Sequence, residues 1–130
     1  MKKWLLVIMV SLFLWGCQSI DSTGVVQNEP ELISPEEAKA MMDANDSIIL
    51  VDVRTLSEYQ SGHIEGALLL PLDTIEAQAE SVIPDKEAVY IIYCRSGNRS
   101  SQAVSLLYSM GYISLYDLGG IIDWPYDIVT

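Results

Sequence analysis

The sequence has few of the residues that build metal sites, disulfide frameworks or nucleic-acid surfaces. It holds two cysteines and one histidine among 130 residues, which leaves no ligand set for a metal ion. Of its seven lysines and arginines, two are Lys2 and Lys3, whereas all eighteen aspartates and glutamates lie beyond Cys17. Five basic and eighteen acidic residues therefore remain after the amino terminus, a balance of −13. A surface this acidic repels phosphate backbones, and no nucleic-acid partner is expected.

The amino terminus has an apolar run that is too short to span a bilayer. Trp4–Trp15 is interrupted only by Ser11, and its length falls short of the ~20 residues that a transmembrane helix needs. An apolar run of this length behind Lys2 and Lys3 is typical of an export signal. We therefore predict a signal peptide over residues 1–16, with an uncleaved anchor as an alternative.

The segment Leu14–Cys17 (Leu-Trp-Gly-Cys) resembles the lipobox of bacterial lipoproteins, although Trp15 stands where that family has a small residue. The resemblance implies that Cys17 is lipidated and becomes the first residue after cleavage. We expect residues 17–31 to be a lipid-anchored linker, because they are mostly polar and contain glycine and proline. The protein would then lie outside the cytoplasm on a bacterial membrane, or be secreted or periplasmic if Cys17 is not lipidated. A disulfide between Cys17 and Cys94 is disfavoured, because it would tie a tail to a functional loop.

Beyond residue 31, segments typical of strands alternate with segments typical of helices. Helices are expected over 35–44, 55–60, 73–83 and 100–110, with a last short one before Pro125, and strands over 48–53, 67–70, 89–93 and 113–116. This alternation favours an α/β domain over 32–130, with a small, mostly parallel sheet and helices on both faces. Ligands of such sheets bind beyond the carboxyl ends of the strands. Cys94 directly follows the strand 89–93.

The loop after this strand has the features of an anion site. Ser100 comes six positions after Cys94, and a helix is expected to begin there with the serine as its cap. Successive amides in such a turn can converge on an anion at the helix amino terminus. Gly97 allows a backbone conformation for this that a larger residue would hinder. Arg95 and Arg99 add positive charge, so we predict a nucleophilic thiolate at Cys94. The alternative is a buried structural cysteine.

The loop Cys94–Arg99 (Cys-Arg-Ser-Gly-Asn-Arg) resembles the active-site loop of the rhodanese family. Three further segments are similar to the family's other signatures, in the same order: Asp52–Arg54 with Glu58-Tyr59, Gly62–Ala67, and Gly119–Ile121 with Trp124. The similarity extends over about Leu32–Tyr126. It implies a rhodanese-like fold for the whole domain.

The resemblance also implies a sulfurtransferase that needs no cofactor. Cys94 would take the sulfane sulfur from a donor such as thiosulfate and pass the resulting persulfide sulfur to cyanide, a thiol or a protein acceptor. The residues implied to bind substrate are Arg95, Ser96, Gly97, Asn98 and Arg99. The residues expected to support the loop are Asp52, Arg54, Glu58 and Ser100.

Two other functions remain open. Dual-specificity phosphatases have a related loop one residue longer than the Cys-x4-Arg spacing seen here, and the shorter loop favours sulfur over phosphate. A sulfur carrier or redox-sensing module with slow turnover is the alternative from another class.

The supporting residues have simpler interpretations as well. Asp52 and Arg54 are expected to hold loop geometry through hydrogen bonds more than to touch substrate. Glu58 is a partner for either Arg54 or Arg99, and the sequence does not choose between them. His63, the only histidine, is expected to be structural, because a low-pKa thiolate needs no general base.

Overall fold

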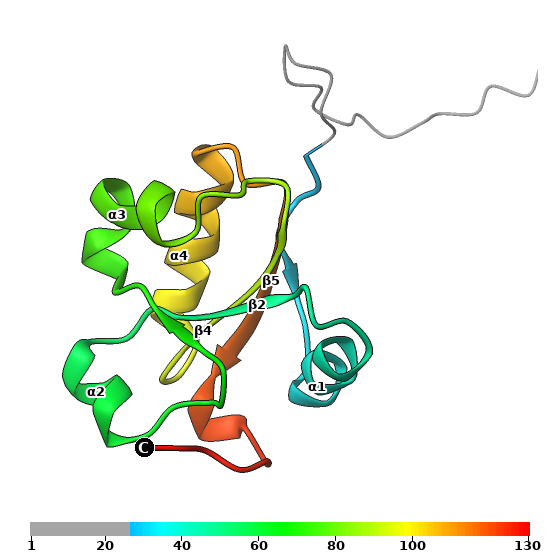
Figure 1. The fold of residues 1–130 in the computed structure, drawn as a ribbon, viewed down its shortest axis with the longest axis vertical. Coiled ribbons are helices and arrows are strands. Elements are labelled where there is room, and N and C mark those ends of the chain that lie inside the picture. Colours follow the sequence, from blue (N-terminus) through cyan, green and yellow to red (C-terminus); the bar gives the residue numbers. More distant parts are fainter. Residues whose placement is uncertain (1–26) are drawn as a thin grey trace, which may run out of the picture.

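The computed structural model describes residues 27–130 (Figure 1). The predicted signal peptide over 1–16, the lipidation at Cys17 and most of the predicted linker lie outside the described residues. Within 27–130, no helix has both the length and the apolar character needed to cross a membrane.

Five parallel strands form one sheet in the order β1-β5-β4-β2-β3. The strands are β1 (Glu31–Leu32), β2 (Ile49–Asp52), β3 (Leu68–Leu69), β4 (Val89–Cys94) and β5 (Ser114–Gly120). This arrangement confirms the predicted α/β fold with a parallel sheet. The prediction missed β1, which begins inside the predicted linker, because two residues are too few to show a periodic pattern.

The first two helices begin where the capping pattern places them. Helix α1 (Pro35–Ala44) has both halves of a capping box between Ser34 and Glu37. Helix α2 (Leu56–Ser61) has the same device between Thr55 and Glu58. Each box satisfies two amides that the first helical turn leaves without partners, so the local sequence is sufficient to start both helices.

The starts of the next two helices differ from the prediction. Asp73 lies in the 3-10 turn η1 (Leu72–Thr74), and α3 (Ile75–Val82) follows without any side-chain cap. Helix α4 (Asn98–Ser109) begins before Ser100, so the expected serine cap is wrong. Gly97, at φ 108°, takes the cap position, because glycine accepts a left-handed backbone at little cost.

Two apolar cores lie on opposite faces of the sheet. Ile92 packs with α3 and α4 on one face, and Ile91 packs with α1 on the other. Figure 1 shows α3 and α4 on one side of the strands and α1 on the other. Adjacent residues of one strand point to opposite faces, so β4 contributes to both cores and is the most deeply buried strand.

Candidate active site

Cys94 is the last residue of β4, the central strand of the sheet. Its backbone pairs with Gly120 of β5, and the preceding residue Tyr93 pairs with Asp52 of β2. The thiol therefore lies at the carboxyl ends of the parallel strands, where the sequence predicts that a ligand binds. Only 1% of the Cys94 surface is exposed.

The sulfur of Cys94 accepts hydrogen bonds from its own loop. The amide of Gly97 donates to Cys94 Sγ at 3.0 Å. Burial alone would raise the pKa of the Cys94 thiol, but hydrogen bonds from Ser100, Gly97 and Ser96 outweigh burial and lower that pKa below its ordinary value. Cys94 is a free thiol. Its burial agrees with the structural alternative, whereas the converging donors are those that stabilise a thiolate.

The loop is pressed against the end of β5. A Cβ on Gly120 would lie 2.3 Å from the carbonyl oxygen of Arg95 and 2.6 Å from Cα of Ser96. Ile122 donates its amide to that same Arg95 carbonyl at 3.2 Å. Close backbone approach and one hydrogen bond therefore hold the first half of the loop. This contact is the physical reason for glycine at position 120, whereas Gly119 has a positive φ of 82° and no atom near its Cβ position.

Glu58 pairs with Arg99 and not with Arg54. The guanidinium of Arg99 donates to both carboxylate oxygens of Glu58, at 2.7 and 2.9 Å. The hydrogen bonds from Arg99 are the main cause that lowers the pKa of Glu58 to about 2. Helix α2 and the start of α4 are thus joined across the site by an ion pair.

Asp52 and Arg54 form a second, buried pair. Arg54 donates to Asp52 Oδ2 at 2.7 Å through Nη2, and the same nitrogen donates to the carbonyl of Gly62 at 2.7 Å. The Tyr93 hydroxyl donates to Asp52 Oδ2 at 3.0 Å and accepts the Ile64 amide at 3.1 Å. These contacts join β2 and β4 to the turn after α2, which is the geometry expected of supporting residues.

A hollow of about 500 Å³ opens over this edge. It is lined by Arg54, Ser57, Glu58, Ser61, Gly62, Arg95, Arg99, Ile121, Ile122 and Ile128. The structure thus brings Arg95 and Arg99 together with the supporting residues Arg54 and Glu58. Within residues 27–130, Arg95 is the lining arginine that has no carboxylate at ion-pair distance.

Other predicted residues lie around the loop without lining the hollow. Ser96 and Asn98 are exposed, and the Asn98 amide oxygen accepts from Gln102 at 3.4 Å on the surface of α4. Ser100 is buried and donates its hydroxyl to the Gly97 carbonyl at 3.1 Å. His63 stacks on Tyr59 with ring centroids 3.7 Å apart, and its Nδ1 lies 2.8 Å from the Tyr59 carbonyl oxygen.

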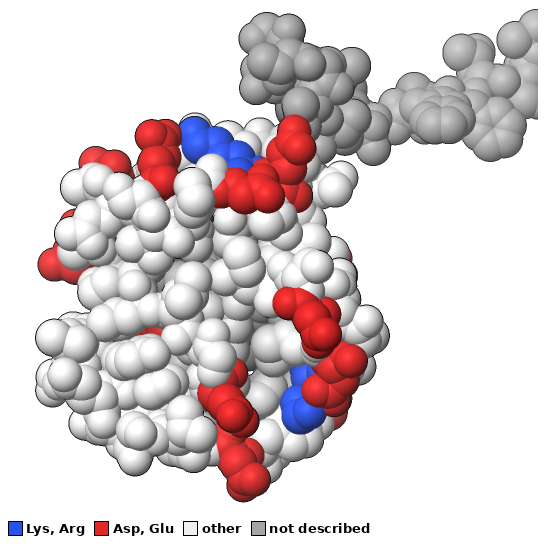
Figure 2. All heavy atoms as spheres, viewed as in Figure 1, with Lys and Arg blue, Asp and Glu red and all other residues white. Residues whose placement is uncertain are grey.

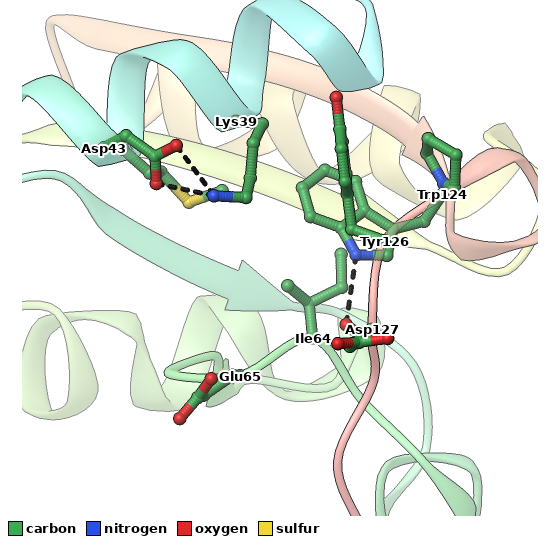
Figure 3. Close-up of a pocket in the computed structure, with 9 residues that line it drawn as sticks. Lys39, Asp43, Ile64, Glu65, Trp124, Tyr126 and Asp127 are labelled. Carbon is green, nitrogen blue, oxygen red and sulfur yellow. Dashed lines mark hydrogen bonds and ion pairs between the residues drawn. The ribbon is translucent and has the colours of Figure 1, made fainter.

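A second hollow, of about 600 Å³, lies between α1 and the carboxyl-terminal segment (Figure 3). Trp124, Tyr126 and Lys39 are among the residues that line it. The ammonium of Lys39 forms an ion pair with Asp43, with Nζ 2.7 Å from Oδ1. No residue of the Cys94 loop contributes to it. The smaller hollow is therefore the candidate site, because Arg95 and Arg99 of the Cys94 loop line it, although Cys94 itself is buried beneath and is not a lining residue.

Sequence reasoning missed the aliphatic wall of the active-site hollow. Ile122 and Ile128 are 63% and 52% exposed, although both line the hollow. Ile128 lies 34 positions from Cys94 in the printed sequence, in a segment that shows no helical or strand periodicity. Its contact with the turn at Gly62 and the backbone bridge between Val129 and His63 place it there.

Known proteins resemble this chain in sequence and fold. A sulfurtransferase of Allochromatium vinosum is 40% identical over 95 residues, which cover 72% of this chain and 86% of that protein. The thiosulfate sulfurtransferase PspE of Escherichia coli is 36% identical over 73 residues, 56% of this chain and 70% of PspE. The structure of an E. coli rhodanese with anions superposes with a TM-score of 0.60 at 32% identity, covering 64% of this chain and 98% of that one.

Some relatives carry other names. A putative sulfur carrier protein of Bacillus subtilis and a tRNA uridine(34) hydroxylase of Photorhabdus laumondii also match, and the chain spans 49% and 28% of their lengths. The family model for the rhodanese-like domain matches residues 34–125. That match contains the Cys94 loop and both of its supporting ion pairs. The chain therefore belongs to the rhodanese-like domain family.

Proposed function

We propose that this chain is a sulfurtransferase that carries sulfane sulfur as a persulfide on Cys94. The observation that carries the proposal is the sulfur itself, at the end of the central strand, with the Gly97 amide at 3.0 Å from Sγ. A thiolate in this position is stabilised by fixed donors, both before sulfur is taken up and when it leaves again as the persulfide is resolved.

The reaction has two balanced halves. The Cys94 thiolate attacks the outer sulfur of a donor such as thiosulfate, the new S–S bond forms, and sulfite leaves with the electron pair of the bond that breaks. An acceptor nucleophile then attacks the outer sulfur of the persulfide and releases the Cys94 thiolate. Arg95, whose guanidinium has no carboxylate partner within residues 27–130, would hold the sulfonate end of the donor.

Two features support a slower carrier role as the second candidate. Cys94 is 1% exposed, which restricts the approach of an acceptor. One relative is named a putative sulfur carrier protein. In that case the persulfide forms but passes slowly to small acceptors.

The test is the intact mass of residues 18–130 before and after thiosulfate, beside the Cys94→Ser variant. These residues contain the whole domain, because the E. coli rhodanese is a separate chain and 98% of it is covered by the match to this protein. We expect the wild type to gain one sulfur atom, to lose it on addition of cyanide, and the variant to gain none. A wild type that stays unchanged, or hydrolyses an aryl phosphate instead, would exclude the proposal. Fast turnover to cyanide separates the enzyme from the carrier.

We also propose an extracytoplasmic location, with the chain anchored through Cys17. Lys2 and Lys3 before the apolar run Trp4–Trp15, and the lipobox-like Leu14–Cys17, support it. Fractionation of cells that express the full chain tests it, because Cys17→Ser would release the protein from the membrane fraction. Equal partition of both forms would contradict lipidation.

A further inference from the structure

Exposed isoleucines border the mouth of the active-site hollow. Ile122 is 63% exposed and Ile128 is 52% exposed, and both line the hollow. A third exposed aliphatic residue, Leu56 at 56%, directly precedes the lining residue Ser57. Isolated exposed apolar residues are ordinary on a protein surface. Here two of the three line one hollow together with Arg95 and Arg99 of the Cys94 loop.

Backbone contacts hold these isoleucines in place. Val129 and His63 exchange two backbone hydrogen bonds, each of 2.8 Å, which fixes the segment that carries Ile128. A Cβ on Gly62 would lie 3.1 Å from Ile128 Cδ1, so the glycine leaves room for that side chain. Ile122 is tied to the Cys94 loop through its amide on the Arg95 carbonyl at 3.2 Å. The apolar border is therefore part of the folded site.

Most of the charge that lines the mouth is paired, and Arg95 is the lining arginine without a carboxylate partner within residues 27–130. Two of the three lining arginines are neutralised, Arg54 by Asp52 and Arg99 by Glu58, each at 2.7 Å. Figure 2 shows carboxylates at the upper end of the molecule, over α1 and at the lower end, where Figure 1 draws the carboxyl-terminal segment, while the surface over α2 is largely uncharged. Figure 1 places the carboxyl terminus beside α2. On the side of α2 the mouth thus adjoins a surface with little charge, and Arg95 is the exposed charged residue of the mouth itself.

We propose that this mouth docks a protein thiol, a cysteine flanked by an apolar side chain, as the acceptor of sulfur from Cys94. The inference rests on the proposed function. More than half of the surface of Ile122 and of Ile128 is exposed to solvent. A small thiol inside the hollow would leave this apolar surface in contact with water. A partner's side chain laid across both isoleucines would remove that apolar surface from water, which favours binding.

The transfer step balances without an added oxidant or reductant. The partner's thiolate attacks the outer sulfur of the Cys94 persulfide, and a new S–S bond forms on the partner. The bond between the two sulfurs on Cys94 breaks, and its electron pair leaves with the Cys94 thiolate. The loop amide on Cys94 Sγ stabilises that leaving anion.

Two peptides of the same length test the proposal: acetyl-Leu-Cys-Leu-amide and acetyl-Gly-Cys-Gly-amide. Residues 18–130 are first loaded with thiosulfate, and the loss of the added sulfur is then followed by mass against peptide concentration. We expect the leucine peptide to react about tenfold faster than the glycine peptide with the wild type, a ratio equivalent to ~1.4 kcal/mol. The double variant Ile122→Asn, Ile128→Asn should bring this ratio close to one.

Leu32→Asn is the matched control, because Leu32 is 74% exposed but does not line the hollow. It should keep the wild-type ratio. Equal rates for the two peptides on the wild type, or a ratio that the double variant retains, would overturn the docking proposal and point to a small thiol. A wild type that never gains sulfur would instead overturn the proposed function.

Discussion

The arginines around the hollow differ in what they are free to bind. Arg54 is buried on Asp52 and Gly62, and Arg99 is held by both oxygens of Glu58. Arg95 has no such partner within residues 27–130. The sequence places Arg95 and Arg99 beside Cys94 and the fold adds Arg54, but the pairing leaves Arg95 as the one without a carboxylate partner within residues 27–130. Two of them serve the geometry of the loop.

The Glu58–Arg99 pair predicts a specific loss of stability at low pH. Glu58→Gln should lower the free energy of unfolding by about 1 kcal/mol at pH 7, a modest value because both side chains are near 30% exposed. The pKa of Glu58 is lowered from 4.5 to about 2 in the folded protein. Its stabilising contribution is therefore complete above pH 4.5 and is lost as the pH falls toward 2. Urea unfolding at a series of pH values measures it.

Glu87→Gln is the control for this series, since Glu87 is exposed and has no ion-pair partner within residues 27–130. It should change the free energy of unfolding by less than about 0.5 kcal/mol. A difference between wild type and Glu58→Gln that stays constant from pH 7 down to pH 2 would mean that the ion pair does not form in solution.

At the scale of elements, the end of β5 shapes the loop that follows β4. Gly120→Ala would place a methyl group against backbone atoms of Arg95 and Ser96, at 2.3 and 2.6 Å. Backbone cannot rotate away as a side chain can, so the loop must move. We expect a loss of about 1–3 kcal/mol in stability and persulfide formation slower by about tenfold or more. Unfolding curves and the mass assay measure the two effects.

Gly66→Ala separates loop displacement from the general cost of replacing a glycine. Gly66 has φ 84° and no atom within 4 Å of its Cβ position. Alanine there should cost about 1 kcal/mol of stability through backbone strain and leave the rate of persulfide formation unchanged. If Gly120→Ala forms the persulfide at the wild-type rate, the contact with β5 does not control the loop.

At the scale of the whole molecule, one sheet carries two cores and should couple them. Ile91 and Ile92 are both fully buried, on opposite faces. Each substitution to alanine should cost about 2–5 kcal/mol. Because the strands belong to both cores, neither face can unfold alone.

Two probes test this coupling in residues 18–130. Trp124, the only tryptophan of that segment, packs on the core that contains Ile91. Far-ultraviolet circular dichroism follows all the helices, including α3 and α4 on the other face. Ile92→Ala should shift the midpoints of both signals equally. A fluorescence midpoint that stays at the wild-type value while the dichroism shifts would show that the faces unfold independently.

Local sequence specifies much of this protein, because its signals act over a few residues. Capping boxes start α1 and α2, apolar runs form β2 and β4, and the spacing from Cys94 to Arg99 defines the loop. The starts of α3 and α4 were misplaced where a 3-10 turn and a left-handed glycine replaced side-chain caps. Backbone conformations of this kind depend on what the chain packs against.

Long-range packing assigns the partners within the site. Glu58 and Arg99 are 41 positions apart, and their pairing depends on how α2 and α4 meet beyond the sheet. The same is true of Ile128, which reaches the mouth through the bridge between Val129 and His63. The sequence by itself thus determines the Cys94 loop, because that loop is one short run of residues. Only the tertiary structure decides which arginine is left unpaired and which isoleucines border the hollow, because no local pattern encodes which distant segments will touch.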